Sequence, residues 1–177
     1  MISKEVFDFA VNIGTQPVNN RYLWHAEDSI PVLTLVNDGT VPFFSDAYSI
    51  LANTLERIYK GVLIELAKIR PSITFPDDFD SNHHFNDTAR IVNQHIPIAS
   101  NREAYYTTLE NLNRIQRGYT GAKFKDVYEL EDFQKDFRRL ELQRKRLYAG
   151  LEQLIIQDRC KDVMHIDDIS HEDLDLE

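Results

Sequence analysis

Along most of the chain, apolar residues recur every three or four positions, the spacing that gathers them on one face of an α-helix. Few stretches alternate with the two-residue period of a β-strand. A first helix is predicted over Arg21–Val36, disturbed by Pro31 and closed at Gly39, where a left-handed residue is expected. The preceding "GTQPVNN" is typical of a loop. The pattern indicates a helical protein.

A longer helix is predicted to begin near Thr40 and Pro42, because proline is favoured in the first turn, and to end at Pro71. Its apolar residues keep helical spacing throughout: Phe44, Ala47, Tyr48, Leu51, Leu55, Ile58, Val62, Leu66 and Ile69. The segment "PSITFPDDFDSN" that follows has two prolines and three aspartates, which is typical of a loop.

Two shorter helices are predicted next. One covers His83–His95 and stops before Pro97. The other begins at "SNRE", a capping box in which the Ser100 hydroxyl accepts from the Glu103 amide and the Glu103 carboxylate accepts from the serine amide. This helix reaches Arg117, where the two glycines of "RGYTGAKFKD" break the pattern.

The last predicted helix covers Glu131–Cys160. Its apolar stripe consists of Phe133, Phe137, Leu140, Leu147, Leu151 and Leu154. Four or five amphipathic helices with short connections favour antiparallel packing. The expected fold is therefore all-α, an antiparallel four- to five-helix up-and-down bundle that forms a single domain over residues 1–161.

Residues 162–177, "DVMHIDDISHEDLDLE", form an acidic tail with seven acidic residues and no lysine or arginine. Removing these seven from the 29 acidic residues of the chain leaves 22, against 20 lysines and arginines. The net charge of −9 therefore arises mostly in the tail and opposes unaided binding to nucleic acid. We expect the tail to be disordered; alternatively, its apolar residues between acids would dock on a basic partner surface.

The composition is that of an ordinary soluble globular protein, and we expect a cytoplasmic location because the chain has a single cysteine. Hydrophobic residues make up 42% of the chain and charged residues 28%. No apolar run approaches the roughly 20 residues that span a bilayer, and the N-terminus lacks signal-peptide features, so no membrane association is expected. The single cysteine, Cys160, cannot form an internal disulfide, which fits a reducing compartment.

Several segments in this order resemble the HEPN family, the higher eukaryotes and prokaryotes nucleotide-binding domain. The stretch "WHAEDSIPVLTLVNDGTVPFFSDAYSILANTLERIYKGVLIEL" resembles the first two helices of that family. The matching positions are Asp28, Gly39, Ala47, Leu55, Glu56 and Lys60. "HHFNDTARIV" resembles the histidine-led third helix, and "RGYTG" is similar to an arginine–tyrosine–proline–glycine turn, with Thr120 in place of proline. The resemblance covers residues 22–156.

This resemblance implies an all-α bundle that often forms a homodimer. Many family members accompany nucleotidyltransferases or act in toxin–antitoxin and defence systems. Some are metal-independent ribonucleases that use an arginine and a histidine four to six positions apart, whereas others lack this pair and act as binding or accessory modules. The partners that the resemblance implies are a second copy, a nucleotidyltransferase or antitoxin protein, and a nucleotide or RNA.

Arg90 and His95 are the candidate catalytic pair. Histidine would act as general acid–base on a ribose 2′-hydroxyl, and arginine would stabilise the developing phosphorane charge. On one regular helix, however, a five-position step separates the two side chains by about 140°, so they would converge only across a dimer interface or at a frayed helix end. Ile91 follows Arg90, where the ribonuclease members place a polar residue. The alternative is a structural or solvent-facing role.

The last helix carries the candidate ligand-binding residues. Arg144 falls within the apolar stripe, so it should extend its guanidinium to solvent, meet an acid, or bind phosphate. Around it lies a basic stretch that would either be a solvated helix face or hold a phosphate-bearing partner, with an aromatic residue for stacking. The proposed ligand-binding residues are Arg138, Arg139, Arg144, Arg146 and Tyr148.

No metal or cofactor is expected. His83 and His84 follow three loop aspartates, but the loop lacks calcium-binding spacing, so capping of the helix start is the favoured role for the histidines. No phosphate-cradling glycine loop or zinc pattern is present. The leading hypothesis is a HEPN-like binding or accessory module. The alternatives are a ribonuclease toxin that uses Arg90 and His95 across a dimer, and a purely structural helical adaptor.

Overall fold

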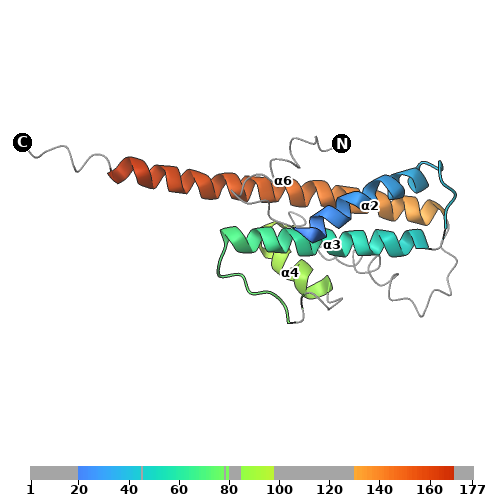
Figure 1. The fold of residues 1–177 in the computed structure, drawn as a ribbon, viewed down its shortest axis with the longest axis horizontal. Helices are drawn as coiled ribbons and strands as arrows, with labels where there is room; N and C mark the ends of the chain where they lie inside the picture. The colour runs from blue at the N-terminus through green and yellow to red at the C-terminus, as the bar shows by residue number, and fades with distance from the viewer. Residues whose placement is uncertain (1–19, 45, 78, 80–84, 98–129, 170–177) are drawn as a thin grey trace, which may run out of the picture.

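The computed structural model describes residues 20–44, 46–77, 79, 85–97 and 130–169. These residues form four helices, α2 (Arg21–Asn37), α3 (Asp46–Ile69), α4 (Phe85–His95) and α6 (Leu130–Ile169), and they contain no strand (Figure 1). The predicted all-α class is confirmed. Among the described residues, none of these helices is long and apolar enough to cross a membrane.

Asn20 starts α2 and attaches it to α3. Its side-chain oxygen accepts a hydrogen bond from the Leu23 amide at 3.2 Å, which satisfies one of the free donors at the helix start. Its Nδ2 donates to the Gly61 carbonyl at 2.9 Å and to Glu65 Oε1 at 2.8 Å. The cap and the α2–α3 contact therefore depend on the same buried side chain.

α2 follows its predicted course almost to the residue. Pro31 lies inside the helix without ending it. Gly39 has φ of 73°, the left-handed conformation predicted from the sequence, and it follows the last turn directly. Because that conformation reverses the chain, α3 returns along α2 in the opposite direction (Figure 1).

α3 is the central helix of the described fold. It begins at Asp46, a few residues after the predicted start, and ends at Ile69 before Pro71, as predicted. Most of its predicted stripe is fully buried: Ala47, Tyr48, Leu51, Leu55, Ile58, Val62 and Leu66. Gly61 allows α2 to approach closely, since a Cβ at this position would lie 2.5 Å from the Cγ of Leu23.

α3 and α6 run parallel to each other. The Tyr48 hydroxyl lies 3.5 Å from Asp136 Oδ2 near the start of both helices, and Arg70 pairs with Asp158 at 2.9 Å near the end of α3. Both pairs are separated by 88 positions, and a constant offset requires parallel helices. The predicted antiparallel arrangement does not hold for this pair. Residues 70–129 separate the two helices, so no short turn forces them to be antiparallel.

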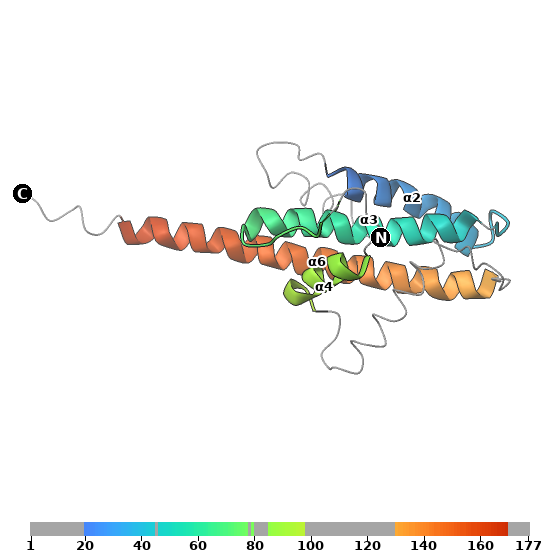
Figure 2. The ribbon, with the colours of Figure 1, turned by 90° about the horizontal axis from the view of Figure 1, so that it is seen from below.

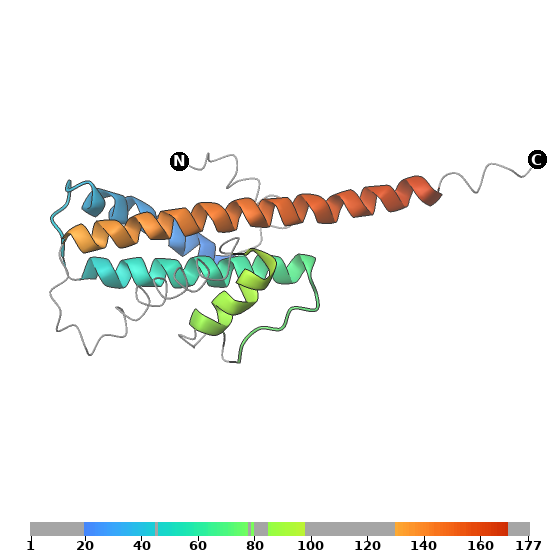
Figure 3. The same cartoon turned by 180° about the vertical axis from the view of Figure 1, so that it is seen from behind.

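α2 is antiparallel to α6, as two of the hydrogen bonds between them show. Gln134 Nε2 donates to the Asn37 carbonyl at 2.7 Å near the start of α6, and Glu27 meets Arg144 further along. α2 covers one side of the α3–α6 pair, whereas α4 lies on the other side, as the views in Figures 1, 2 and 3 show together. α3 therefore lies between α2 and α4.

α6 is longer than predicted. It begins at Leu130 and continues past Cys160 to Ile169, so its last turns belong to the segment for which disorder was expected. The predicted boundary at residue 161 thus falls inside a helix. The capping box at Ser100–Glu103, the helix that follows it, the "RGYTG" turn, His83, His84 and residues 170–177 lie outside the described residues.

Candidate functional site

Arg144, one of the predicted ligand-binding residues, is held by two carboxylates. It lies on the face of α6 that packs against α2, and its side chain is 7% exposed. Its Nη1 lies 2.6 Å from Glu27 Oε2, and its Nε donates to Glu141 Oε1 at 2.9 Å. Burial opposes the charge, but the two carboxylates outweigh it and raise the pKa of the guanidinium. The salt-bridge alternative predicted for Arg144 is confirmed.

Tyr148 completes this cluster one turn further along α6. Its hydroxyl donates to Glu27 Oε1 at 2.7 Å, so Glu27 binds Arg144 with one oxygen and Tyr148 with the other. Burial and the adjacent Glu27 carboxylate raise the pKa of Tyr148 well above its ordinary value, because both disfavour a phenolate. Tyr148 therefore acts as a hydrogen-bond donor between helices, and its hydroxyl is committed within the fold.

Arg146 points to the opposite side of α6, toward α3 and α4. Its Nη1 donates to the Ile96 carbonyl at 2.9 Å, and its Nη2 donates to Asn93 Oδ1 at 3.2 Å and to the Tyr59 hydroxyl at 3.3 Å. All three of these acceptors are neutral groups. Burial lowers the pKa of Arg146, partly offset by Tyr59. Arg146 thus holds α4 against the rest of the fold.

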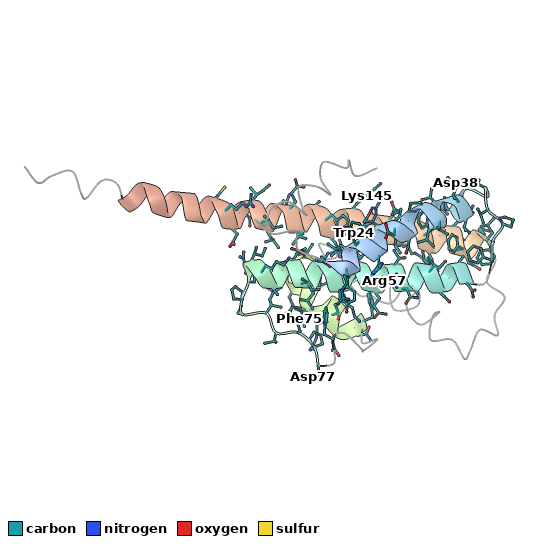
Figure 4. The ribbon with its side chains drawn as sticks, viewed as in Figure 1. Trp24, Asp38, Arg57, Phe75, Asp77 and Lys145 are labelled. Atoms are coloured by element: carbon teal, nitrogen blue, oxygen red, sulfur yellow. The ribbon has the colours of Figure 1, made fainter. Side chains whose placement is uncertain are left out.

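The remaining predicted residues, Arg138 and Arg139, lie nearer the start of α6. Arg138 is exposed, and Arg139 pairs with the buried Asp136 at 2.7 Å. The exposed Lys145 also lies on the outer side of this helix (Figure 4). The five predicted ligand-binding residues therefore do not form one site, because they point in three directions around α6. The basic stretch as a whole does not face solvent, since Arg144 and Arg146 are directed into the fold.

Arg90 and His95 both lie on α4. Arg90 is exposed, and its Nη2 lies 3.3 Å from Asp87 Oδ1 in the preceding turn. The helix stays regular up to its end, where the Ile96 amide still donates to the Val92 carbonyl at 2.9 Å. The helix end is therefore not frayed in the way that would bring the pair together within one chain. Convergence of Arg90 and His95 would require a second copy.

The outward face of α2 carries apolar side chains that the sequence analysis did not identify. Trp24 is 61% exposed, Leu35 43% and Val32 41%, and Pro31 between them is exposed as well. Figure 4 shows Trp24 near the start of α2 and Asp38 just beyond its end. The exposure of Trp24 follows from helical spacing, because the buried residues of α2 lie about 100–180° from it around the helix: Leu23, Ala26, Leu33 and Val36.

In the described part of the chain, no three histidine, cysteine or carboxylate side chains come together as a metal site. Comparison with known proteins yields no matching family model, curated protein or solved structure. The candidate sites are thus defined by geometry alone: two arginine clusters that hold helices together, and one exposed apolar face on α2.

Proposed function

We propose that this protein is a HEPN-like helical accessory module that acts by binding another polypeptide chain through the outward face of α2. The observation that carries this proposal is the exposure of Trp24 together with Leu35 on one side of α2. Exposed apolar side chains that share one face of a helix are typical of protein interaction sites, and tryptophan is among the residues most enriched in them. The HEPN resemblance suggests the setting, a cytoplasmic toxin–antitoxin or defence system.

The predicted ligand-binding residues already bind other groups of the same chain, and this favours polypeptide binding over nucleotide binding. Arg144 and Tyr148 already share Glu27, and Arg146 is occupied by α3 and α4. A phosphate group would have to displace a carboxylate from Arg144, which would leave Glu27 without its charge partner. The exposed Arg138 and Lys145 remain the candidates for a phosphate contact on α6. Calorimetry with a nucleotide tests them: if they form such a site, the double variant Arg138→Ala, Lys145→Ala loses the binding that the wild type shows.

In-cell photo-crosslinking tests the binding face. Leu35→p-benzoylphenylalanine places the crosslinker within the α2 face, and Leu142→p-benzoylphenylalanine is the matched control, since Leu142 is an exposed leucine on α6. The proposal predicts a discrete adduct with another polypeptide chain from position 35 and none from position 142. Absence of an adduct at position 35, or equal adducts at both positions, would contradict it.

The second candidate function is a ribonuclease toxin in which Arg90 and His95 meet across a dimer. The observation that supports it is the exposure of Arg90. The ion pair between Arg90 and Asp87 lies at the surface and is weak, so it leaves the guanidinium accessible. An RNA cleavage assay with the purified full-length chain, Arg90→Ala and His95→Ala separates the two functions. The accessory module predicts no cleavage that depends on either residue. Cleavage lost in both variants would establish the ribonuclease instead.

A further inference from the structure

We propose that α3, α4 and α6 enclose a binding site for one small monovalent anion, of the size of chloride, nitrate or formate, beside the guanidinium of Arg146. The anion would be held by Arg146 Nε and Asn93 Nδ2. The proposal is independent of the outward face of α2, which lies on the other side of the α3–α6 pair (Figures 2 and 3). It follows from a positive charge that the described residues leave without a negative partner.

Two buried nitrogen atoms have no hydrogen-bond partner at the place where α6 meets α4. They are Arg146 Nε and Asn93 Nδ2. Asn93 is 6% exposed, and its Oδ1 accepts from Arg146 Nη2 at 3.2 Å, so the two unpartnered atoms belong to adjacent side chains. Among the described residues, the other buried side-chain atom without a partner is Gln143 Oε1, an acceptor that could not hold an anion. Because an unpaired buried donor costs stability, an acceptor placed beside both nitrogens would be bound.

Arg146 differs from Arg144 in the charge of its partners. Arg144 binds two carboxylates, whereas the acceptors around Arg146 are a carbonyl, an amide oxygen and a hydroxyl. In the part of the chain that the structure describes, no carboxylate pairs with Arg146. A guanidinium stays protonated even when it is buried, and a buried charge without a counter-charge is costly. A bound anion would supply the missing charge.

The end of α4 supplies part of this counter-charge. Arg146 Nη1 donates to the carbonyl of Ile96, just past the last residue of the helix. The C-terminus of a helix carries about half an elementary negative charge, spread over its free carbonyls. The site therefore keeps a positive charge of less than one unit. A monovalent anion neutralises such a charge, whereas a dianion such as sulfate would leave an excess of negative charge in the interior.

The packing around Arg146 limits the anion to a few atoms. Gly150 lies about one turn later on α6, and a Cβ at this position would lie 2.5 Å from Ile96 Cγ2. Both proposed donor atoms are shielded from solvent. A nucleotide would have to displace α4 to reach them. A small anion bound at the free Nε keeps the existing hydrogen bonds of Arg146 in place, and it would strengthen the attachment of α4 to α6.

Urea denaturation of the full-length protein in different sodium salts at constant ionic strength tests the site. Urea is the denaturant because guanidinium chloride would itself supply a small anion. Sodium gluconate, whose anion is too large for the site, is the reference, and chloride, nitrate or formate replaces it stepwise. A ligand that binds only the folded protein raises the folding equilibrium constant by about tenfold for each tenfold increase in concentration above its Kd. We expect this dependence for at least one of the three anions.

Two variants locate the effect. Asn93→Asp places a carboxylate beside Arg146, so this variant should be more stable than the wild type in gluconate and should lose the anion dependence. Arg146→Met should also lose the dependence, because it removes the charge. Arg144→Met is the matched control. It lowers stability but should keep the anion dependence, since the salt bridges of Arg144 lie on the side of α6 that faces α2.

Equal stability of the wild type in gluconate and in all three small anions would overturn the proposal, because Arg146 would then need no added counter-charge. A dependence that persists in Asn93→Asp would also overturn it, since the anion would bind elsewhere. So would a dependence that is lost in Arg144→Met, which would assign the effect to the basic stretch of α6 as a whole. If Arg146→Met fails to fold, Asn93→Asp and Arg144→Met still decide between these outcomes.

Discussion

Arg144 and Glu27 lie 117 positions apart in the sequence and meet at 2.6 Å between α6 and α2. The pair is nearly buried on the arginine side, and Glu27 also receives the Tyr148 hydroxyl. A residue that sequence reasoning assigns to ligand binding is therefore part of the contact that joins the first and last described helices. Stability measurements can separate these two roles.

Arg144→Met should lower the free energy of unfolding by about 2–4 kcal/mol, because it leaves Glu27 and Glu141 partly buried without their cation. Chemical denaturation measures the loss. Arg138→Met, an exposed arginine of the same helix, is the control and should change stability by less than about 0.5 kcal/mol. Glu27→Gln combined with Arg144→Met should destabilise less than the sum of the single changes. Strict additivity would contradict direct coupling.

Tyr148→Phe should destabilise the protein by about 1–2 kcal/mol near neutral pH, where the hydroxyl donates to the Glu27 carboxylate. The folded pKa of Tyr148 is raised, so this contribution is complete below the unfolded pKa of about 10 and is lost as pH rises toward the folded value. The stability difference between wild type and variant should therefore shrink above about pH 10. A difference that stays constant into strong alkali would show that the pKa of Tyr148 is not raised by folding.

Gly61→Ala should destabilise the α2–α3 contact by about 1–3 kcal/mol, although alanine favours helix more than glycine does. The added Cβ would lie 2.5 Å from the Cγ of the buried Leu23, which cannot move without shifting α2. Thermal unfolding measures the effect. Adding Leu23→Ala makes room for the new methyl group, so the double variant should lose less stability than the two single variants predict together. Full additivity would mean that the helices are not in close contact here.

Arg146→Met should loosen α4 more than the rest of the fold. Arg146 donates to the Ile96 carbonyl beyond the last turn of α4, and to Asn93 within that helix. Hydrogen exchange of the α4 amides should accelerate by about tenfold or more, which corresponds to roughly 1.4 kcal/mol of local opening. The amides of α3 that pack against α2 should change less. Uniform acceleration across all helices would indicate a global role instead.

The helices were predictable because local pattern determines them. The three-four spacing of apolar residues predicted α2 to within one residue of its end, and Gly39 adopts its predicted left-handed conformation. The relative direction of α3 and α6 could not be predicted in this way. It depends on contacts such as that between Arg70 and Asp158, whose 88-position separation no local pattern encodes.

The candidate sites were less predictable because side-chain direction matters more than proximity in sequence. Arg144 and Arg146 are two positions apart, which places them about 160° apart around α6. One meets the acids of α2 and α6, whereas the other meets neutral groups of α3 and α4. The basic stretch was predicted to form one face of α6, but its arginines point to different sides of the helix. The exposed face of α2 was not predicted, because helical spacing alone does not show whether another helix covers an apolar residue such as Trp24.

The most direct test of the central claim uses Trp24, the single tryptophan of the chain, as its own reporter. Because Trp24 is 61% exposed in the free protein, its burial against a bound polypeptide chain should shift its emission to shorter wavelength. Emission that stays that of an exposed indole in the adduct purified after crosslinking at position 35 would contradict binding through α2.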